Sequence, residues 1–113
     1  MSNLIYKIVD EATWRKAESQ GEFAGASIDL TDGYIHFSTD QQVQETADKH
    51  FAGQTGLLLV AVDTDVLEGD LRWEPSRGGD LFPHLYGKLN TQQVASVSAI
   101  QLDKNGKHII DLA

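Results

Sequence analysis

The apolar run LLLVAVD at residues 57–63 places the strongest limit on the folds open to this chain. A strand with one wet face alternates apolar and polar residues, whereas a short unbroken apolar run is typical of a strand covered on both faces. We therefore expect a strand here with other elements packed on each side. The chain has 113 residues, which is the length of one domain, and we expect a single domain over residues 1–113.

Other stretches rich in β-branched and aromatic residues also predict strands. These stretches are residues 4–9, 34–38 and 71–74, together with a hairpin of 94–103 and 107–113 around Lys104-Asn105-Gly106. Strands thus collect in the second half of the chain without intervening helices. This order indicates an α+β fold with a largely antiparallel or mixed sheet.

Two N-terminal helices are predicted from their start and stop signals. Residues 10–21 have Asp10 as an N-cap and Gly21 as a stop. Residues 39–53 open with a capping box of Thr39 and Gln42, and their apolar residues recur at helical spacing. Residues 22–31 and 76–90 are expected to be loops, and either one could close over a site.

Composition limits the cell compartment and the classes of binding partner that we expect. The formal net charge is −8, so nucleic acids and anionic membranes are repelled at long range and are disfavoured as partners. The chain has no cysteine, which excludes a disulfide scaffold, thiolate catalysis and cysteine-ligated zinc. We find no signal-peptide pattern and no apolar run of the ~20 residues that span a bilayer. A cytoplasmic protein is expected.

Strand alternation points to a candidate site. In residues 34–38, Ile35 and Phe37 share one face, and Tyr34, His36 and Ser38 share the other. The first pair belongs in the core. The second set is either the wet face of an antiparallel sheet or part of a site.

The side chains of residues 71–74 alternate in the same way. Leu71 and Trp73 are expected to face the core, and Arg72 and Glu74 are expected on the polar face. If the two strands are near neighbours, both polar faces line one cleft. His84 and Tyr86, from the glycine-rich loop, would then close over it. The simpler alternatives are an ion pair of Arg72 with Glu74 and a histidine that fixes a turn.

Basic residues gather near this predicted cleft. Arg72, Arg77 and Lys88 fall within 17 residues that also contain His84. They are either scattered surface cations or a local basic pocket for a small phosphorylated ligand. The chain has no G-x-G-x-x-G and no Walker lysine motif, so neither standard nucleotide-binding fold is supported. A metal site of His36, His84 and Glu74 is a further alternative.

The motifs GYIHFST, LRWE and LFPHLYG, in this order and at this spacing, resemble the bacterial family known as domain of unknown function 952. The resemblance covers nearly the whole chain, from YKIV near the N-terminus. It implies the fold of ADP-ribosyltransferases, a split and strongly bent α+β sheet with the NAD cleft between its halves.

Enzymes of that fold commonly use an early His or Arg, a middle aromatic or Ser, and a later Glu or Gln on strands. The resemblance implies that Glu74 is the later acid and that His36 with Ser38 matches a His-x-Ser of related phosphotransferases. Only Tyr6 or Lys7 is available at the early position.

The function expected is thus a transferase acting on NAD or a ribose phosphate, with NAD as a substrate. Its catalytic residues would be Glu74 and His36, and its ligand-binding residues Tyr34, Ser38, Arg72, Arg77, His84 and Tyr86. One alternative is a binding module for a nucleotide or small anion without catalysis. Another is a domain whose surface binds a protein partner.

Overall fold

Strand β4 (Leu57–Asp63) lies inside the main sheet, as its apolar run predicts. The computed structural model describes residues 3–67, 69–76, 79–110 and 112. The main sheet has the order β1-β4-β8-β9, and every neighbouring pair is antiparallel. The other strands of this sheet are β1 (Leu4–Asp10), β8 (Ser96–Leu102) and β9 (His108–Ile109).

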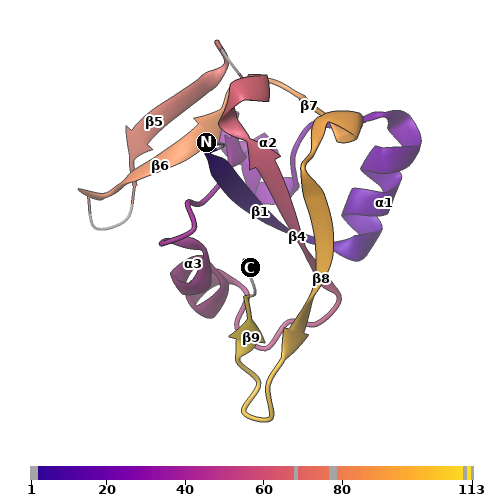
Figure 1. The fold of residues 1–113 in the computed structure, drawn as a ribbon, viewed down its shortest axis with the longest axis vertical. Helices are drawn as coiled ribbons and strands as arrows, with labels where there is room; N and C mark the ends of the chain where they lie inside the picture. Colours follow the sequence, from indigo (N-terminus) through magenta and orange to yellow (C-terminus); the bar gives the residue numbers. More distant parts are fainter. Residues whose placement is uncertain (1–2, 68, 77–78, 111, 113) are drawn as a thin grey trace.

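Both faces of β4 are buried, because its side chains alternate between two apolar clusters. Leu58, Val60 and Val62 pack in one cluster, toward helix α1 (Glu11–Gln20). The second cluster takes Leu57, Leu59 and Ala61, together with helix α3 (Val43–His50). The two helices therefore lie on opposite sides of the main sheet (Figure 1).

Helix α1 begins and ends where its capping residues predict. The Asp10 carboxylate accepts hydrogen bonds from the Thr13 N–H at 2.9 Å and the Thr13 hydroxyl at 2.7 Å. Gly21 follows the last turn with a φ of 84°, a left-handed conformation that favours glycine.

Helix α3 is shorter than the predicted helix at residues 39–53. The Thr39 N–H donates to the Gln42 side chain at 3.0 Å, which is one half of the predicted capping box. The Thr39 carbonyl also accepts from the N–H groups of Gln42 and Val43, which makes a turn before the helix. The helix then runs only from Val43 to His50.

Two segments that were expected to be loops contain regular structure. Residues 22–31 hold strand β2 (Glu22–Phe23) and most of helix α2 (Ser27–Asp32). Residues 76–90 hold strands β6 (Leu81–Leu85) and β7 (Leu89–Asn90). The prediction was wrong because α2 is too short to show a helical period, and because Pro83 argues against a central strand. The described part of the chain therefore has three α-helices, and not the two expected.

A second sheet carries the candidate residues. It has the order β3-β6-β5 and is antiparallel, with β3 (Ile35–His36) and β5 (Leu71–Pro75) at its edges. β2 pairs with β7 in a separate two-stranded ladder. Two 3₁₀ helices, η1 (Thr64–Leu67) and η3 (Thr91–Gln93), complete the described elements.

The second sheet joins the main sheet next to β1. Tyr6 and Ser38 exchange backbone hydrogen bonds, each at 2.8 Å, although Ser38 lies beyond the end of β3. This bridge makes one strongly curled antiparallel surface from β5 to β9, and the β5–β6 hairpin extends away from the main sheet (Figure 1). Within the described ranges, no helix is long and apolar enough to cross a membrane.

Candidate functional site

His84 is at the centre of the candidate site. In the register of the second sheet, His84 on β6 pairs with His36 on β3 and with Arg72 on β5. The two strands predicted to share a cleft are therefore in one sheet, with β6 between them. His84 belongs to this central strand, so the expectation that a loop carries it was wrong, whereas Tyr86 lies in the short connection between β6 and β7.

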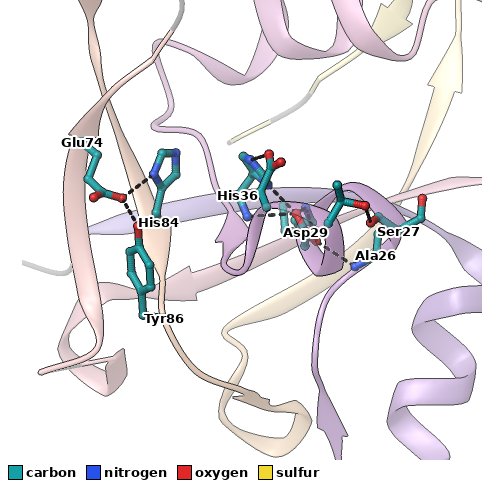
Figure 2. A network of polar contacts seen from close by, with 10 residues as sticks. Ala26, Ser27, Asp29, His36, Glu74, His84 and Tyr86 are labelled. Carbon is teal, nitrogen blue, oxygen red and sulfur yellow. Dashed lines mark hydrogen bonds and ion pairs between the residues drawn. The ribbon is translucent and has the colours of Figure 1, made fainter.

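Glu74 holds the imidazole of His84 (Figure 2). Its Oε1 lies 2.9 Å from His84 Nδ1 and accepts a second hydrogen bond, at 2.7 Å, from the Tyr86 hydroxyl. These bonds from Tyr86 and His84 lower the pKa of Glu74, against the effect of its burial. The bond to Glu74 correspondingly raises the pKa of Tyr86. An ionised Glu74 accepts, so the proton of a neutral His84 lies on Nδ1 and Nε2 is its acceptor.

His36 is held between two carboxylates of α2. Its Nδ1 lies 2.6 Å from Asp29 Oδ1, and its Nε2 lies 3.0 Å from Asp32 Oδ2. The His36 backbone N–H also donates to Asp29, at 3.1 Å. Both ring nitrogens can donate only when the ring carries two protons. His36 thus has a carboxylate at each ring nitrogen, whereas His84 keeps one nitrogen outside its carboxylate contact.

Asp29 and Lys7 form a buried ion pair beneath His36. Lys7 Nζ lies 2.9 Å and 2.8 Å from the two Asp29 oxygens, and Asp29 is only 1% exposed. Burial favours the neutral form of Asp29, but the hydrogen bond from His36 and the charge of Lys7 outweigh it and lower the pKa of Asp29 to about 2. The pKa of Lys7 is lowered by its burial, although Asp29 opposes this.

Tyr34 lies against the rings of both histidines and of Tyr86. Tyr34 stacks on His84 with ring centroids 4.2 Å apart, and its centroid is 4.7 Å from that of His36 and 5.1 Å from that of Tyr86. The two imidazole centroids are 5.3 Å apart. The Arg72 guanidinium lies 5.6 Å from the Tyr86 ring centroid. Six of the residues predicted from the sequence therefore meet: Tyr34, His36, Arg72, Glu74, His84 and Tyr86.

Other predicted residues have different places. Ser38 is buried, and its hydroxyl lies 2.9 Å from that of Thr46 on α3. Arg77 lies outside the described residues. Trp73, which was expected to pack in the core, is 46% exposed because β5 is an edge strand and only Leu71 packs against the core cluster. Phe82 is buried.

A pocket of about 470 Å³ opens beside the two histidines. One wall comes from the main sheet, and the rest comes from β3, β6, α2 and α3. Its lining residues include Lys7, His36, Ser38, His50, Phe82 and His84. Tyr34, Arg72, Glu74 and Tyr86 are not among the lining residues, so Glu74 reaches this pocket through His84.

The predicted metal site has no geometric support. In the ranges that the structure describes, no group of three His, Cys, Asp or Glu side chains is arranged to hold a metal ion. Both nitrogens of His36 face carboxylates, and Nδ1 of His84 faces Glu74.

Sequence reasoning missed Asp29. Its partners, Lys7 and His36, are 22 and 7 residues away in the chain. Asp29 also lies in a segment that was expected to be a loop. The only local signal was Lys7 itself, a charged residue within an otherwise apolar strand. A buried lysine requires a carboxylate partner, but the sequence does not say which one.

Comparison with known proteins places the chain in a family. Residues 8–97 match the family model described as Protein of unknown function (DUF952). The crystal structure of protein CC0527 from Caulobacter crescentus has a TM-score of 0.90 and 48% identity, covering 94% of this chain and 93% of that chain. Its solution NMR structure has a TM-score of 0.84 and 49% identity, covering 92% and 90%. No curated protein matches the chain. Because the model spans most of the sequence, the chain belongs to the family Protein of unknown function (DUF952).

Proposed function

We propose that the pocket beside the two histidines binds NAD or a ribose phosphate, and that His84 transfers a proton during a reaction at the ribose. One observation carries this proposal. His84 lines the pocket while Glu74 holds its Nδ1 at 2.9 Å. A carboxylate that orients an imidazole in this way leaves Nε2 as a positioned base.

The pocket suits a small ligand with a phosphate and a ring. Its volume of about 470 Å³ is in the range of small-molecule sites. His84 and the hydroxyls of Thr46 and Ser76 supply hydrogen-bonding groups for phosphate oxygens, and Phe37 and Phe82 supply apolar surface. These groups lie together on a chain whose net charge is −8.

An ADP-ribosyltransferase-like fold is part of this proposal. The pocket lies between β1 of the main sheet and strands β3 and β6 of the second sheet. That arrangement agrees with a split, bent sheet whose cleft holds NAD. Lys7, Ser38 and Glu74, from the three motif strands, all lie at or next to this pocket.

The proposed reaction is transfer of the ribosyl group from nicotinamide to an acceptor hydroxyl. The acceptor oxygen bonds to C1′ of the ribose and gives its proton to His84 Nε2. The bond from C1′ to nicotinamide nitrogen breaks, and its electron pair leaves with nicotinamide. Glu74 stabilises the imidazolium that forms, so it acts through His84 and not by direct contact with the ribose.

The test combines binding with turnover. We expect saturable binding of NAD by calorimetry and nicotinamide release that is visible by proton NMR. Glu74→Gln should keep the binding but lower the rate by about 100-fold or more, because the amide cannot stabilise the imidazolium. Glu22→Gln is the matched control, since this exposed residue pairs with Lys88 away from the pocket and its change should leave the rate unchanged. An unaltered rate in Glu74→Gln would exclude the assigned role.

A binding module without catalysis is the second candidate. Two observations favour it: Glu74 does not line the pocket, and Lys7 at the early motif position is already paired with Asp29. Saturable binding of NAD by the unmodified protein, with no nicotinamide released, would select this candidate over the transferase.

A further inference from the structure

Trp73 is a large apolar side chain that the edge position of β5 leaves exposed. It lies on edge strand β5, opposite Pro83 in the register, and on the other face from Glu74. Nearly half of the side chain is open to solvent, whereas Trp14 is completely buried. A large aromatic surface left in water is typical of a recognition site.

Trp73 forms one wall of a second pocket, of about 460 Å³. The other walls come from the start of β1, the turn before α3 and the start of η1. The residues that line it are Asn3, Leu4, Ile5, Tyr6, Thr39, Asp40, Thr64 and Trp73. The pocket is thus built from four segments that are distant in the sequence.

The charge of this second pocket is negative. Asp40 is the acidic residue of its lining, and none of the described lining residues is basic. Asp40 is exposed and forms no ion pair within the described part of the chain. Burial and then the charge of Asp40 raise the pKa of Tyr6, which also lines this pocket. Hydroxyl and amide oxygens of Asn3, Thr39 and Thr64 add further acceptors.

We propose that this second pocket binds the guanidinium group of an arginine side chain. A guanidinium stacks flat on an indole and directs several N–H donors outward in its own plane. Trp73 offers the indole, and Asp40 with the neighbouring hydroxyls offers the acceptors. A lysine ammonium is a point charge that would use Asp40 without the planar stacking. An anion would be repelled, and a neutral group would leave Asp40 without a counter-charge.

This inference is independent of the function proposed above. The second pocket contains neither His36 nor His84, and the two pockets share only Tyr6 among their described lining residues. A result for NAD binding in the first pocket therefore neither supports nor excludes arginine binding at Trp73.

The chain provides its own spectroscopic reporters. Its two tryptophans, Trp14 and Trp73, give separate indole N–H signals in a nitrogen–proton correlation spectrum, and Trp73→Phe assigns them. Titration with N-acetyl-arginine amide should shift the Trp73 signal to saturation and leave the Trp14 signal in place. N-acetyl-citrulline amide, which is neutral and of the same shape, should give no saturating shift. N-acetyl-lysine amide should bind at least about threefold more weakly.

Two variants that each remove one carboxylate distinguish binding at this pocket from general electrostatic attraction to an acidic protein. Asp40→Asn should weaken binding of N-acetyl-arginine amide by about tenfold or more, because a charge-assisted hydrogen bond is lost. Asp65→Asn changes the net charge by the same amount. Asp65 follows Thr64 in the sequence but does not line the pocket, so this variant should bind N-acetyl-arginine amide as tightly as the unmodified protein.

Trp73→Ala should abolish the binding, and the unchanged Trp14 signal in that variant reports that the protein is folded. Three results would overturn the proposal: equal losses in the two acidic variants, equal affinity for the arginine and citrulline compounds, or shifts confined to His36 and His84.

Discussion

The carboxylate of Asp29 has partners on every side. It accepts hydrogen bonds from the Lys7 ammonium, the His36 ring and backbone, and the Ala26 N–H. A buried carboxylate with several donors stays ionised and stabilises the folded state. The charge of Asp29 therefore fixes the position of α2 and, through it, of His36.

Removal of this charge should destabilise the protein strongly. We expect Asp29→Asn to lower the free energy of unfolding by about 3–5 kcal/mol, because Lys7 stays buried without a counter-charge. The double variant Lys7→Met with Asp29→Asn should recover part of this loss, since it removes the unpaired charge. Urea unfolding followed by circular dichroism measures both. Equal stabilities of the single and double variants would contradict the ion-pair explanation.

The same carboxylate predicts a dependence of stability on acid. The pKa of Asp29 in the folded protein is about 2, below the ordinary value of 3.8, so the folded state favours the ionised form. Its contribution is complete above pH 3.8, declines as the pH falls toward 2, and amounts to about 2 kcal/mol. Urea unfolding at pH 5 and pH 2.5 should show this decline in the unmodified protein and a smaller one in Lys7→Met with Asp29→Asn.

The sequence predicted single residues well where local alternation decides their direction. Ile35 and Phe37 are buried and His36 is on the opposite face, because side chains alternate along any strand. Trp73 was placed wrongly, because alternation does not reveal that β5 is an edge strand with nothing packed on that part. The roles of His84 and Tyr86 depend on Glu74 at distances of 10 and 12 residues, and local patterns do not report such contacts.

Helix α2 is held between two glycines of different kinds. Gly25 has a φ of 122°, and a Cβ there would lie 2.7 Å from the Asp29 Cβ. Gly33 has a φ of 89°, but a Cβ there would have no atom within 4 Å. The first glycine is needed for close approach as well as backbone conformation, and the second for backbone conformation alone.

These two glycines allow a matched pair of alanine variants. Gly33→Ala should lower the free energy of unfolding by about 1–2 kcal/mol, from the strain of a left-handed conformation. Gly25→Ala should lower it further and also shift the NMR signals of the His36 ring, because Asp29 must move. Similar losses in both variants, with unchanged His36 signals, would show that contact with Asp29 does not matter.

Whole elements were predictable where their pattern is long or their caps are strong. The strand at residues 57–63 and the helix after Asp10 meet these conditions, and both are confirmed. Helix α2 covers six residues and its N-cap, Ala26, has no polar side chain, so its pattern is too short to recognise. Strand β6 contains Pro83 and follows two glycines, which locally favour a loop. Pairing on both sides, by β3 and β5, is what makes it a strand.

The molecule as a whole depends on a central strand with two covered faces. The curled sheet has α1 on one side and α3 on the other, and each side has its own apolar cluster. Leu58 and Leu59 are each 4% exposed but belong to different clusters. Because the β4 side chains on both faces are buried, each face belongs to a core.

Truncation of either leucine should therefore be costly. We expect Leu58→Ala and Leu59→Ala each to lower the free energy of unfolding by about 2–5 kcal/mol, from lost burial and the cavity that remains. Leu30→Ala is the control, since Leu30 is 65% exposed, and its effect should stay within about 0.5 kcal/mol. Thermal unfolding compares the three variants. A mild effect for one of the two buried leucines would mean that its face of β4 is not a true core.

The ion pair of Lys7 with Asp29 also limits which substitutions this sequence can accept during evolution. Lys7, Gly25, Asp29 and His36 come from four separate stretches, and the Asp29 side chain contacts Lys7 and His36 and lies close to Gly25. Replacement of Lys7 or Asp29 by a neutral residue leaves the other charge buried without a partner, and a side chain at position 25 would clash with Asp29. We therefore expect these four positions to vary together, so that relatives that differ at one of them also differ at others.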